Sequence, residues 1–441
     1  MSQAARIAIV GSGVSGLVAA HTLKDHANIT LFEAGGYFGG HTHTVDVTLP
    51  DGQNKPVTHG VDTGFLVYNE RTYPGLIRLL DELGVKSAKS DMSFSVSAMR
   101  PGERPLEWSG ASLSSVFAQR SNLHSPRFWR MLSDLLRFNA LCTRLAREGA
   151  DAQLSQTLEQ FLQEHRFGVA FRDWYLLPML ACIWSCPTDE MLRFPLATMI
   201  RFCHNHGLIQ ITNRPQWYTV DGGARQYVLR IVRGLPDKRL NCPVLRIERD
   251  AWGVTLITPA GRERFDEVVI ATHADQALAM LAAPSADEAA VLSAVRYQPN
   301  RAVLHTDTSV MPSRKSAWAA WNYESAGPQA ANDPATTRVC LHYLINRLQP
   351  LPFDRPVIVS LNPVRPIDAR HVLGEYAYDH PVFDLSAMQA QRRLTRLQGQ
   401  QRTWFCGAWA GYGFHEDGLQ SGLAVAGLLG QRPHGAWRGA A

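Results

Sequence analysis

Residues 6–33 of the chain read RIAIVGSGVSGLVAAHTLKDHANITLFE. The wholly apolar run at residues 7–10 is typical of a parallel strand that is buried on both faces. A glycine cluster follows it, then a segment suited to a helix at residues 17–23 and a second apolar run at residues 29–32. This order of strand, helix and strand predicts a βαβ unit, the opening of a Rossmann-type α/β fold.

The glycine cluster fits the pattern G-x-G-x-x-G with the residues Gly11, Ser12, Gly13, Val14, Ser15 and Gly16. The first glycine permits the tight turn, the second lets the backbone approach a pyrophosphate, and the third lets helix and strand pack closely. The helix N-terminus offers unpaired N–H groups to the phosphates. Glu33 ends the second strand, where a carboxylate can accept hydrogen bonds from a ribose. The motif predicts a bound dinucleotide, because a turn without a ligand explains this combination poorly.

Three later segments are also rich in glycine: GYFGGHT at residues 36–42, DTGF at 62–65 and GAWAGYGFHEDG at 407–418. With them, the sequence resembles the flavin-containing amine oxidase and phytoene desaturase-like superfamily over nearly its whole length. The resemblance extends to residues 217–223 and 268–273. The resemblance implies that the dinucleotide is FAD. The first glycine motif alone does not distinguish FAD from NAD.

The resemblance also implies which residues hold the cofactor. Besides the glycine cluster, they are Glu33, Ala34, Gly39, Gly40, His41, Thr42, Gly64, Phe65, Val244, Gly407, Asp417 and Gly418. The family's second loop usually reads G-R-x-G-G-R, and Tyr37 and His41 replace its two arginines here. Val244 matches the position whose backbone meets the adenine, and Asp417 and Gly418 open a helix directed at the flavin. We expect non-covalent FAD, although Cys406 and His415 leave a covalent link open.

Three residues are candidates for the catalytic site. Amine oxidases of the superfamily frame their substrate with two aromatic side chains, and His415 falls at one of these positions, which argues against an amine substrate. His415 is a candidate base, proton relay or flavin partner, and its alternative is a structural role in the loop. Trp217 and Tyr218 are candidates for the pocket wall, with the hydrophobic core as the alternative.

No metal site is expected. The pairs His41 and His43, and His204 and His206, lack further ligands at a recognisable spacing, and Cys182 and Cys186 lack a second pair. Motifs of the form G-x-S-x-G or H-E-x-x-H are absent from the sequence.

The composition indicates a folded protein of two domains, with 441 residues, 45% of them hydrophobic and 19% charged. The net charge of +5 is spread along the chain, which favours anionic surfaces such as phospholipid over nucleic acid. Seven cysteines at irregular spacings indicate free thiols in a reducing compartment. With no leader-like segment and no long apolar run, we expect a cytoplasmic protein, and peripheral attachment to a membrane is left open.

The returning strand and helix patterns predict two interleaved domains. An FAD-binding domain is assigned to residues 1–75, 215–275 and 400–432, and an α+β substrate domain to residues 76–214 and 276–399. In the substrate domain, helices are expected at residues 128–145, 154–165 and 172–183. In the FAD domain, strands are expected at 244–249, 253–257, 268–271 and 404–407 and a helix at 419–429, before a loose tail from residue 431.

Superfamily members most similar in appearance are associated with cyclopropane fatty-acid synthases. This resemblance favours a long acyl chain as the substrate and an FAD-dependent dehydrogenase or desaturase that removes hydride from a C–H bond. Two alternatives remain: a flavin amine oxidase, and a flavin-binding accessory protein of a lipid-modifying methyltransferase.

Overall fold

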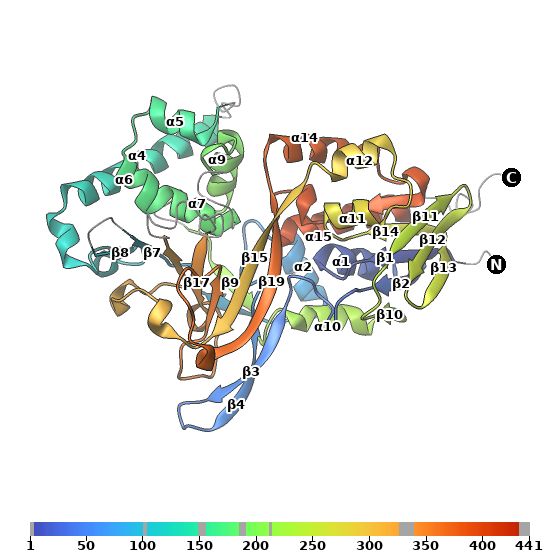
Figure 1. Cartoon of the computed structure of the whole chain (residues 1–441), viewed down its shortest axis with the longest axis horizontal. Helices are drawn as coiled ribbons and strands as arrows, with labels where there is room; N and C mark the ends of the chain where they lie inside the picture. The colour runs from blue at the N-terminus through green and yellow to red at the C-terminus, as the bar shows by residue number, and fades with distance from the viewer. Residues whose placement is uncertain are drawn as a thin grey trace.

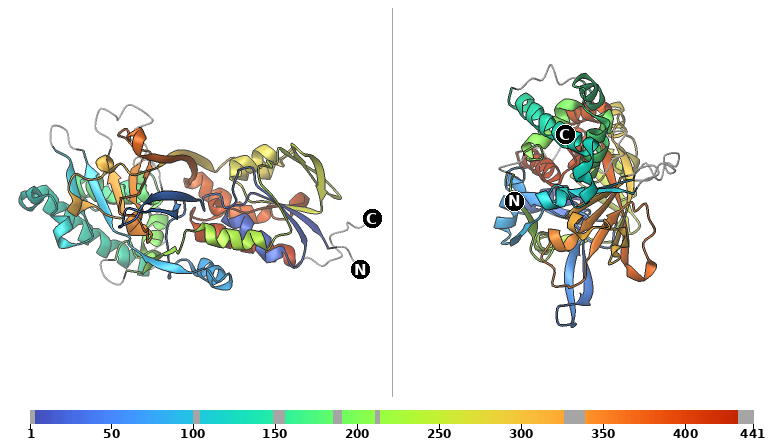
Figure 2. Two further views of the ribbon diagram at one scale, coloured as in Figure 1. Left: turned by 90° about the horizontal axis from the view of Figure 1, so that it is seen from below. Right: turned by 90° about the vertical axis from the view of Figure 1, so that its left-hand side faces the viewer.

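The computed structural model describes residues 4–99, 104–148, 156–184, 191–210, 214–325 and 339–431. They form two lobes that lie side by side along the long axis (Figure 1), also when the molecule is turned (Figure 2). The lobe on the right of Figure 1 holds the glycine cluster, and we call it the nucleotide lobe; the other is the substrate lobe. This mixed architecture confirms the predicted α/β fold class.

A five-stranded parallel sheet forms the centre of the nucleotide lobe. In spatial order its strands are β10 (Asp237–Arg239), β2 (Asn28–Phe32), β1 (Arg6–Val10), β14 (Glu267–Ile270) and β20 (Thr403–Phe405). The apolar run at residues 7–10 lies in the middle strand, and all four of its side chains are at most 4% exposed. The sheet thus joins three remote segments of the chain, in the interleaved pattern expected from the sequence, while the domain bounds themselves stay predictions.

Two helices whose N-termini flank the glycine cluster pack against each other beside this sheet. They are α1 (Val14–Leu23) and α15 (His415–Gly430). A Cβ atom on Gly422 would overlap the backbone oxygen of Ser15, so only glycine permits this approach. The helix α15 begins four residues before the predicted position because the Asp417 carboxylate accepts a 2.9 Å hydrogen bond from the Phe414 N–H at its N-terminus.

Further elements complete the nucleotide lobe. They are α2 (Pro74–Glu82), α10 (Arg225–Arg233), α11 (Ala274–Met280), α12 (Ala286–Leu292), α14 (Leu385–Arg393) and the antiparallel sheet of β11 (Arg246–Asp250), β12 (Gly253–Thr258) and β13 (Gly261–Phe265). A hairpin of β3 (Thr44–Pro50) and β4 (Pro56–Asp62) projects from the body of the molecule (Figure 1). A small sheet contains β5 (Tyr68–Asn69), β9 (Trp217–Val220) and β6 (Ser87–Ser90).

A seven-stranded sheet forms the substrate lobe. In spatial order its strands are β19 (Val372–Val382), β15 (Arg296–His305), β18 (Ile358–Leu361), β17 (Cys340–Leu344), β16 (Trp321–Glu324), β7 (Phe94–Ala98) and β8 (Leu106–Ser109). Its helices are α3 (Leu113–Val116), α4 (Pro126–Glu148), α5 (Leu158–Glu164), α6 (Val169–Phe171), α7 (Leu177–Trp184), α9 (Leu196–Asn205) and α13 (Ile345–Leu348). The long strands β15 and β19 run between the two lobes (Figure 1).

The predicted elements recur with shifted ends. The helix α4 is five residues longer than expected, and α5 begins at Leu158 because the Thr157 hydroxyl accepts a 3.3 Å hydrogen bond from the Gln160 N–H. The helix expected at residues 172–183 opens as a π-helical turn over Arg172–Leu176 before α7. Cys186 and nearly all of the predicted tail lie outside the described residues.

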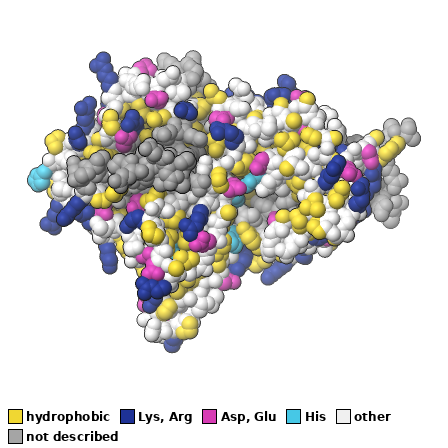
Figure 3. Space-filling model, in the orientation of Figure 1, with side chains coloured by type: hydrophobic (Ala, Val, Ile, Leu, Met, Phe, Trp, Pro, Cys, Tyr) yellow, Lys and Arg dark blue, Asp and Glu magenta, His cyan; other side chains and the backbone are white. Residues whose placement is uncertain are grey.

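The visible face of the molecule carries Lys and Arg side chains scattered over both lobes, with acidic side chains among them (Figure 3). This face therefore shows no continuous basic stripe of the kind that binds nucleic acid. In the described part of the chain, no helix is both long and apolar enough to span a bilayer.

Replacement of Gly422 by alanine is expected to destabilise the protein by about 1–3 kcal/mol, because the new methyl group meets backbone that cannot move aside. Gly427 is the matched control in the same helix, since a Cβ there has no neighbour within 4 Å. Gly427→Ala should stabilise the helix by about 0.5–1 kcal/mol. Thermal unfolding of the two variants measures both effects, and an equal response would contradict the proposed role of the α1–α15 contact.

Candidate functional site

A cavity of about 1360 Å³ extends from the glycine cluster into the substrate lobe. It is larger than the roughly 300–1,000 Å³ of a pocket for one small ligand. Most of the predicted cofactor residues line it: Gly11, Ser12, Gly13, Val14, Ser15, Glu33, Ala34, Gly39, Gly40, His41, Thr42, Gly64, Phe65, Val244 and Gly407. The cavity therefore has room for a dinucleotide together with a second molecule.

The Glu33 carboxylate organises the nucleotide end of the cavity. One of its oxygens accepts hydrogen bonds from the backbone N–H and the hydroxyl of Ser12, at 3.0 and 2.5 Å. Its other oxygen accepts from the Gly35 N–H at 2.8 Å, and the Ser12 hydroxyl in turn accepts from the Gly39 N–H at 3.1 Å. These bonds join the first glycine turn to the second glycine loop.

The glycine cluster has the open geometry that a phosphate group needs. Gly11 has a φ of +99°, which favours glycine, and a Cβ on Gly16 would overlap the backbone oxygen of Gly11. A Cβ on Gly13 would have no neighbour within 4 Å, so this backbone faces open space next to the N-terminus of α1. Gly16 itself packs inside the turn and, within the described residues, is not part of the cavity wall.

Three histidines from remote segments meet beside the second glycine loop. The His41 ring lies 6.1 Å from that of His273 and 5.5 Å from that of His380, between ring centres. Burial and the neighbouring histidines hold the pKa of His41 well below its ordinary value, and burial lowers the pKa of His380 to about 4. The Nε2 atom of His41 is buried and has no hydrogen-bond partner among the described residues.

A buried polar atom without a partner costs about 1–3 kcal/mol, so the His41 ring indicates a polar ligand in this part of the cavity. The open backbone at Gly13 and the unpartnered His41 both fit the phosphates of FAD. In this arrangement the glycine cluster and His41 would hold the pyrophosphate, and Glu33 would meet the ribose.

His415 lies in the cavity wall at the start of α15. Its ring stacks on that of Phe65, with centres 3.8 Å apart, and its Nε2 atom is 2.8 Å from the Tyr227 hydroxyl, which lies 2.7 Å from the Thr42 hydroxyl. Burial lowers the pKa of His415 to about 3. A histidine so held is neutral at physiological pH, and these contacts suit the structural role. The role of His415 as a base, proton relay or flavin partner stays a prediction.

Trp217 and Tyr218 lie on opposite faces of β9. Trp217 lines the cavity, and its ring centre is 6.5 Å from that of His206. Tyr218 stacks on Tyr68 at 6.0 Å and lies outside the described cavity lining, because successive side chains of a strand alternate between its faces. Tyr218 is half-buried and packs against the core of the nucleotide lobe, in keeping with its alternative assignment.

Asp417, Gly418 and Cys406 also lie outside the described cavity lining. Asp417 acts through the end of α15, and burial raises its pKa to about 6. A Cβ on Gly418 would lie 2.7 Å from Val14, so this glycine serves helix packing. Cys406 is buried in the core of the nucleotide lobe, and a covalent link to the flavin is not tested by these contacts.

The sequence analysis missed two groups of residues. Asp62 is fully buried, and its carboxylate accepts hydrogen bonds from the Ala224 N–H, the Gln349 amide and the Thr44 hydroxyl, which joins the two lobes. Burial raises the pKa of Asp62 to about 7. The second group is an aromatic wall, in which the Phe202 ring stacks between His206 at 3.9 Å and Phe414 at 4.6 Å. The motif DTGF at residues 62–65 contains Asp62 and could have indicated the first group. No local sequence pattern indicates the second group.

The model of the flavin-containing amine oxidoreductase family matches residues 14–355, so the chain belongs to this family. It is an FAD-dependent oxidoreductase, and the predicted cofactor and enzyme class are confirmed.

Among curated proteins, the chain is similar to protoporphyrinogen oxidase 2 of Arabidopsis thaliana, with 30% identity over 197 residues. That match covers 42% of this chain and only 34% of the plant enzyme. Among solved structures, cyclohexylamine oxidase from Brevibacterium oxydans has a TM-score of 0.66 at 18% identity and covers 97% of this chain and 99% of its own. A fatty acid isomerase from P. acnes that produces CLA has the same TM-score and coverage at 16% identity. These structural likenesses show the shared fold.

His41 should make FAD affinity depend on pH. The free protein keeps His41 neutral, and an anionic pyrophosphate favours the protonated ring, so FAD binding should take up a proton. Affinity should then fall as pH rises between about 5 and 8, and His41→Asn should weaken binding about tenfold at the acidic end and flatten the pH profile. Fluorescence titration of FAD measures both.

His43 provides the control, because its Nδ1 atom already lies 2.9 Å from the Tyr378 hydroxyl. A His43→Asn variant should keep the pH profile of the wild type. The same pH dependence in His41→Asn as in the wild type would rule out this role of His41.

Proposed function

We propose that the protein removes hydride from a C–H bond of a long-chain acyl lipid, as a dehydrogenase or desaturase. The observation that carries the proposal is the apolar far half of the cavity. Its lining there consists mainly of Leu113, Val116, Leu132, Leu135, Leu136, Met179, Ile183, Val359 and Leu361. Such a wall stabilises a hydrocarbon chain by roughly 25 cal/mol per Å² of apolar surface removed from water.

The chemistry divides between cofactor and protein. FAD, when bound, accepts the hydride that leaves the substrate carbon. The protein binds and orients the chain along the apolar wall and excludes water. The neutral rings of His206 and His415 suit this environment, since burial lowers their pKa values to about 4 and about 3.

In the described cavity lining, three carboxylates could hold an ammonium group, and two of them already have partners. Glu33 is at the nucleotide end, Asp91 faces Arg347 at 3.5 Å, and Asp379 lies next to the His380 of the histidine group. This arrangement favours a lipid over a polyamine. An amine oxidase remains the second candidate, supported by the aromatic wall and by the fold shared with cyclohexylamine oxidase.

Two buried polar atoms in the cavity wall favour a lipid with a polar group. The Trp321 indole N–H and the Asn139 side-chain oxygen are both buried, and neither has a hydrogen-bond partner among the described residues. The indole donor suits the carbonyl oxygen of an ester or a carboxyl group, and the amide acceptor suits the O–H of a protonated carboxyl group.

The far end of the cavity supports entry of the substrate from a lipid surface. Leu113 and Leu136 line the cavity and are 82% and 54% exposed, so apolar wall continues onto the surface. Arg137 and the half-exposed Trp129 lie on the same helix, α4. We propose peripheral contact with an anionic membrane at this end, where leucine and tryptophan side chains enter the interface.

Anaerobic bleaching of the flavin tests the function. The FAD-loaded protein is mixed with phospholipids and free fatty acids in one series and with mono- and polyamines in the other. Bleaching by a lipid with formation of a new double bond supports the proposal, and bleaching by an amine with release of an aldehyde establishes the second candidate. Bleaching by neither, together with stable binding to a lipid methyltransferase, would favour an accessory role.

Leu135→Trp should lower lipid-dependent bleaching at least tenfold, because the larger ring fills the apolar half of the cavity. Leu141→Trp is the matched control, since Leu141 is a half-buried residue of the same helix that lies outside the described cavity lining. Rapid-scan absorption measures the bleaching rates. Equal rates in the two variants would place the substrate elsewhere.

Trp321→Phe should weaken lipid binding about fivefold to tenfold at little cost in stability, because its N–H has no partner in the described protein. Trp318→Phe serves as the control, since the Trp318 N–H donates a 2.8 Å hydrogen bond to the Pro312 carbonyl. The control should lose stability and keep lipid affinity. Equilibrium binding and thermal unfolding separate the two responses, and unchanged lipid affinity in Trp321→Phe would contradict the assignment.

A further inference from the structure

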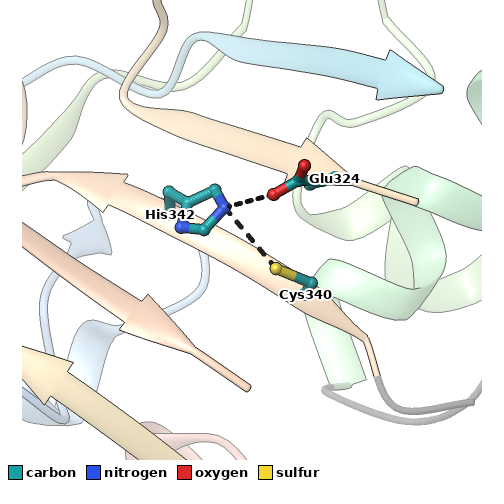
Figure 4. A group of neighbouring side chains, drawn as sticks. All are labelled: Glu324, Cys340 and His342. Carbon is teal, nitrogen blue, oxygen red and sulfur yellow. Dashed lines mark hydrogen bonds and ion pairs between the residues drawn. The ribbon is translucent and has the colours of Figure 1, made fainter. Parts of the chain in front are cut away.

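Three chemically different side chains meet on the seven-stranded sheet, outside the site described above (Figure 4). Glu324 lies on β16, and Cys340 and His342 lie on the neighbouring strand β17. Glu324 and Cys340 are direct cross-strand partners, and His342 is two residues further along, on the same face. Trp321 and Tyr343 are paired on the same two strands and line the cavity. Because side chains alternate between the two faces of a sheet, Glu324, Cys340 and His342 lie on the face that is turned away from the cavity.

The distances within the group are close to those between the ligands of a zinc ion. The His342 Nε2 atom lies 3.5 Å from the Cys340 sulfur and 3.1 Å from an oxygen of Glu324. Zinc binds such atoms at about 2.0–2.3 Å, so two ligands of a tetrahedral site lie about 3.3–3.6 Å apart. The three atoms all lie within 4.8 Å of one another. The 3.5 Å separation falls in this range and the 3.1 Å separation just below it, so small side-chain shifts would bring the three atoms to three corners of a tetrahedron.

Surrounding hydrogen bonds hold the three side chains in this orientation. The other ring nitrogen of His342 lies 2.6 Å from the Ser360 hydroxyl, which lies 2.7 Å from His305. The second oxygen of Glu324 lies 2.7 Å from the Arg365 guanidinium. Metal ligands are commonly oriented by such outer partners, which leave the ligating atoms facing one another.

We propose that Glu324, Cys340 and His342 bind one zinc ion. A sulfur, an imidazole nitrogen and a carboxylate oxygen form a zinc-type donor set, unlike the all-oxygen sets of magnesium and calcium. Binding displaces the proton of the Cys340 thiol and any proton on His342 Nε2, and these leave to solvent. The three ligands are at most 7% exposed, so the bound ion would be shielded from solvent and would link β16 to β17, with the fourth position of the tetrahedron left for a water molecule.

This site was not predicted from the sequence, where no metal was expected. The rival arrangement has no metal: a protonated His342 donates to Glu324 and lies beside the Cys340 sulfur. Burial acts to lower the pKa of His342, but Cys340 and Glu324 raise it to about 9. Only one of the two arrangements contains zinc, so a metal analysis of the protein distinguishes them.

Metal analysis of the full-length, FAD-loaded protein tests the proposal. Protein from zinc-supplemented cells is freed of loosely held ions and analysed by element-selective mass spectrometry. We expect about one zinc per chain in the wild type and at least a tenfold loss in Cys340→Ser. Cys203→Ser, a change at another buried free cysteine, should keep the zinc.

X-ray absorption at the zinc edge of the wild type does not depend on how the variants fold. It should show one sulfur at about 2.3 Å among lighter ligands. A wild type that neither retains zinc nor takes it up from solution would overturn the proposal in favour of the protonated histidine. Zinc without a sulfur ligand, or zinc fully retained in Cys340→Ser, would overturn it as well.

Discussion

The contact between α1 and α15 is the constraint on which the site depends. Both helices begin at the cavity, and both are needed there, since α1 brings the glycine cluster and α15 brings His415. Their backbones approach so closely that Gly422 has no room for a side chain against Ser15. The two helices come from opposite ends of the sequence. Their packing therefore also fixes the position of β1 relative to β20, which are the first and last strands of the nucleotide sheet along the chain.

The chemical character of the cavity wall changes from one end of the cavity to the other. The nucleotide end contains backbone N–H groups, the carboxylates of Glu33 and Asp379 and three histidines, whose pKa values burial lowers. The far end consists mainly of leucine, isoleucine, valine and methionine side chains. Between them stand the aromatic wall and His415, which are polar enough to orient a ligand and uncharged at physiological pH. One end of the cavity thus suits an anionic cofactor, and the other excludes charge.

Sequence reasoning succeeded where the determinants are local. The βαβ unit in residues 6–33 follows from strand period, glycine spacing and a carboxylate at the strand end, all within one stretch of chain. It failed where strands and helices from remote segments meet. His41, His273 and His380 form a group only because three segments converge, and Tyr218 faces the core because of the register of β9. His415 was located by its motif, but its partner Tyr227 lies 188 residues away.

The place of β20 and α15 in the chain also bears on how the protein is made. The ribosome adds about 5–20 residues per second, so the stretch from Arg6 in β1 to Thr403 in β20 takes roughly 20–80 seconds to synthesise. Throughout that time β14 lacks its outer neighbour, and the face of α1 that receives α15 is uncovered. The nascent chain thus cannot complete a flavin-binding domain until β20 and α15 have emerged. Stable cofactor binding therefore has to wait for α15, and a chain cut short before residue 403 would expose apolar surface to chaperones and proteases instead.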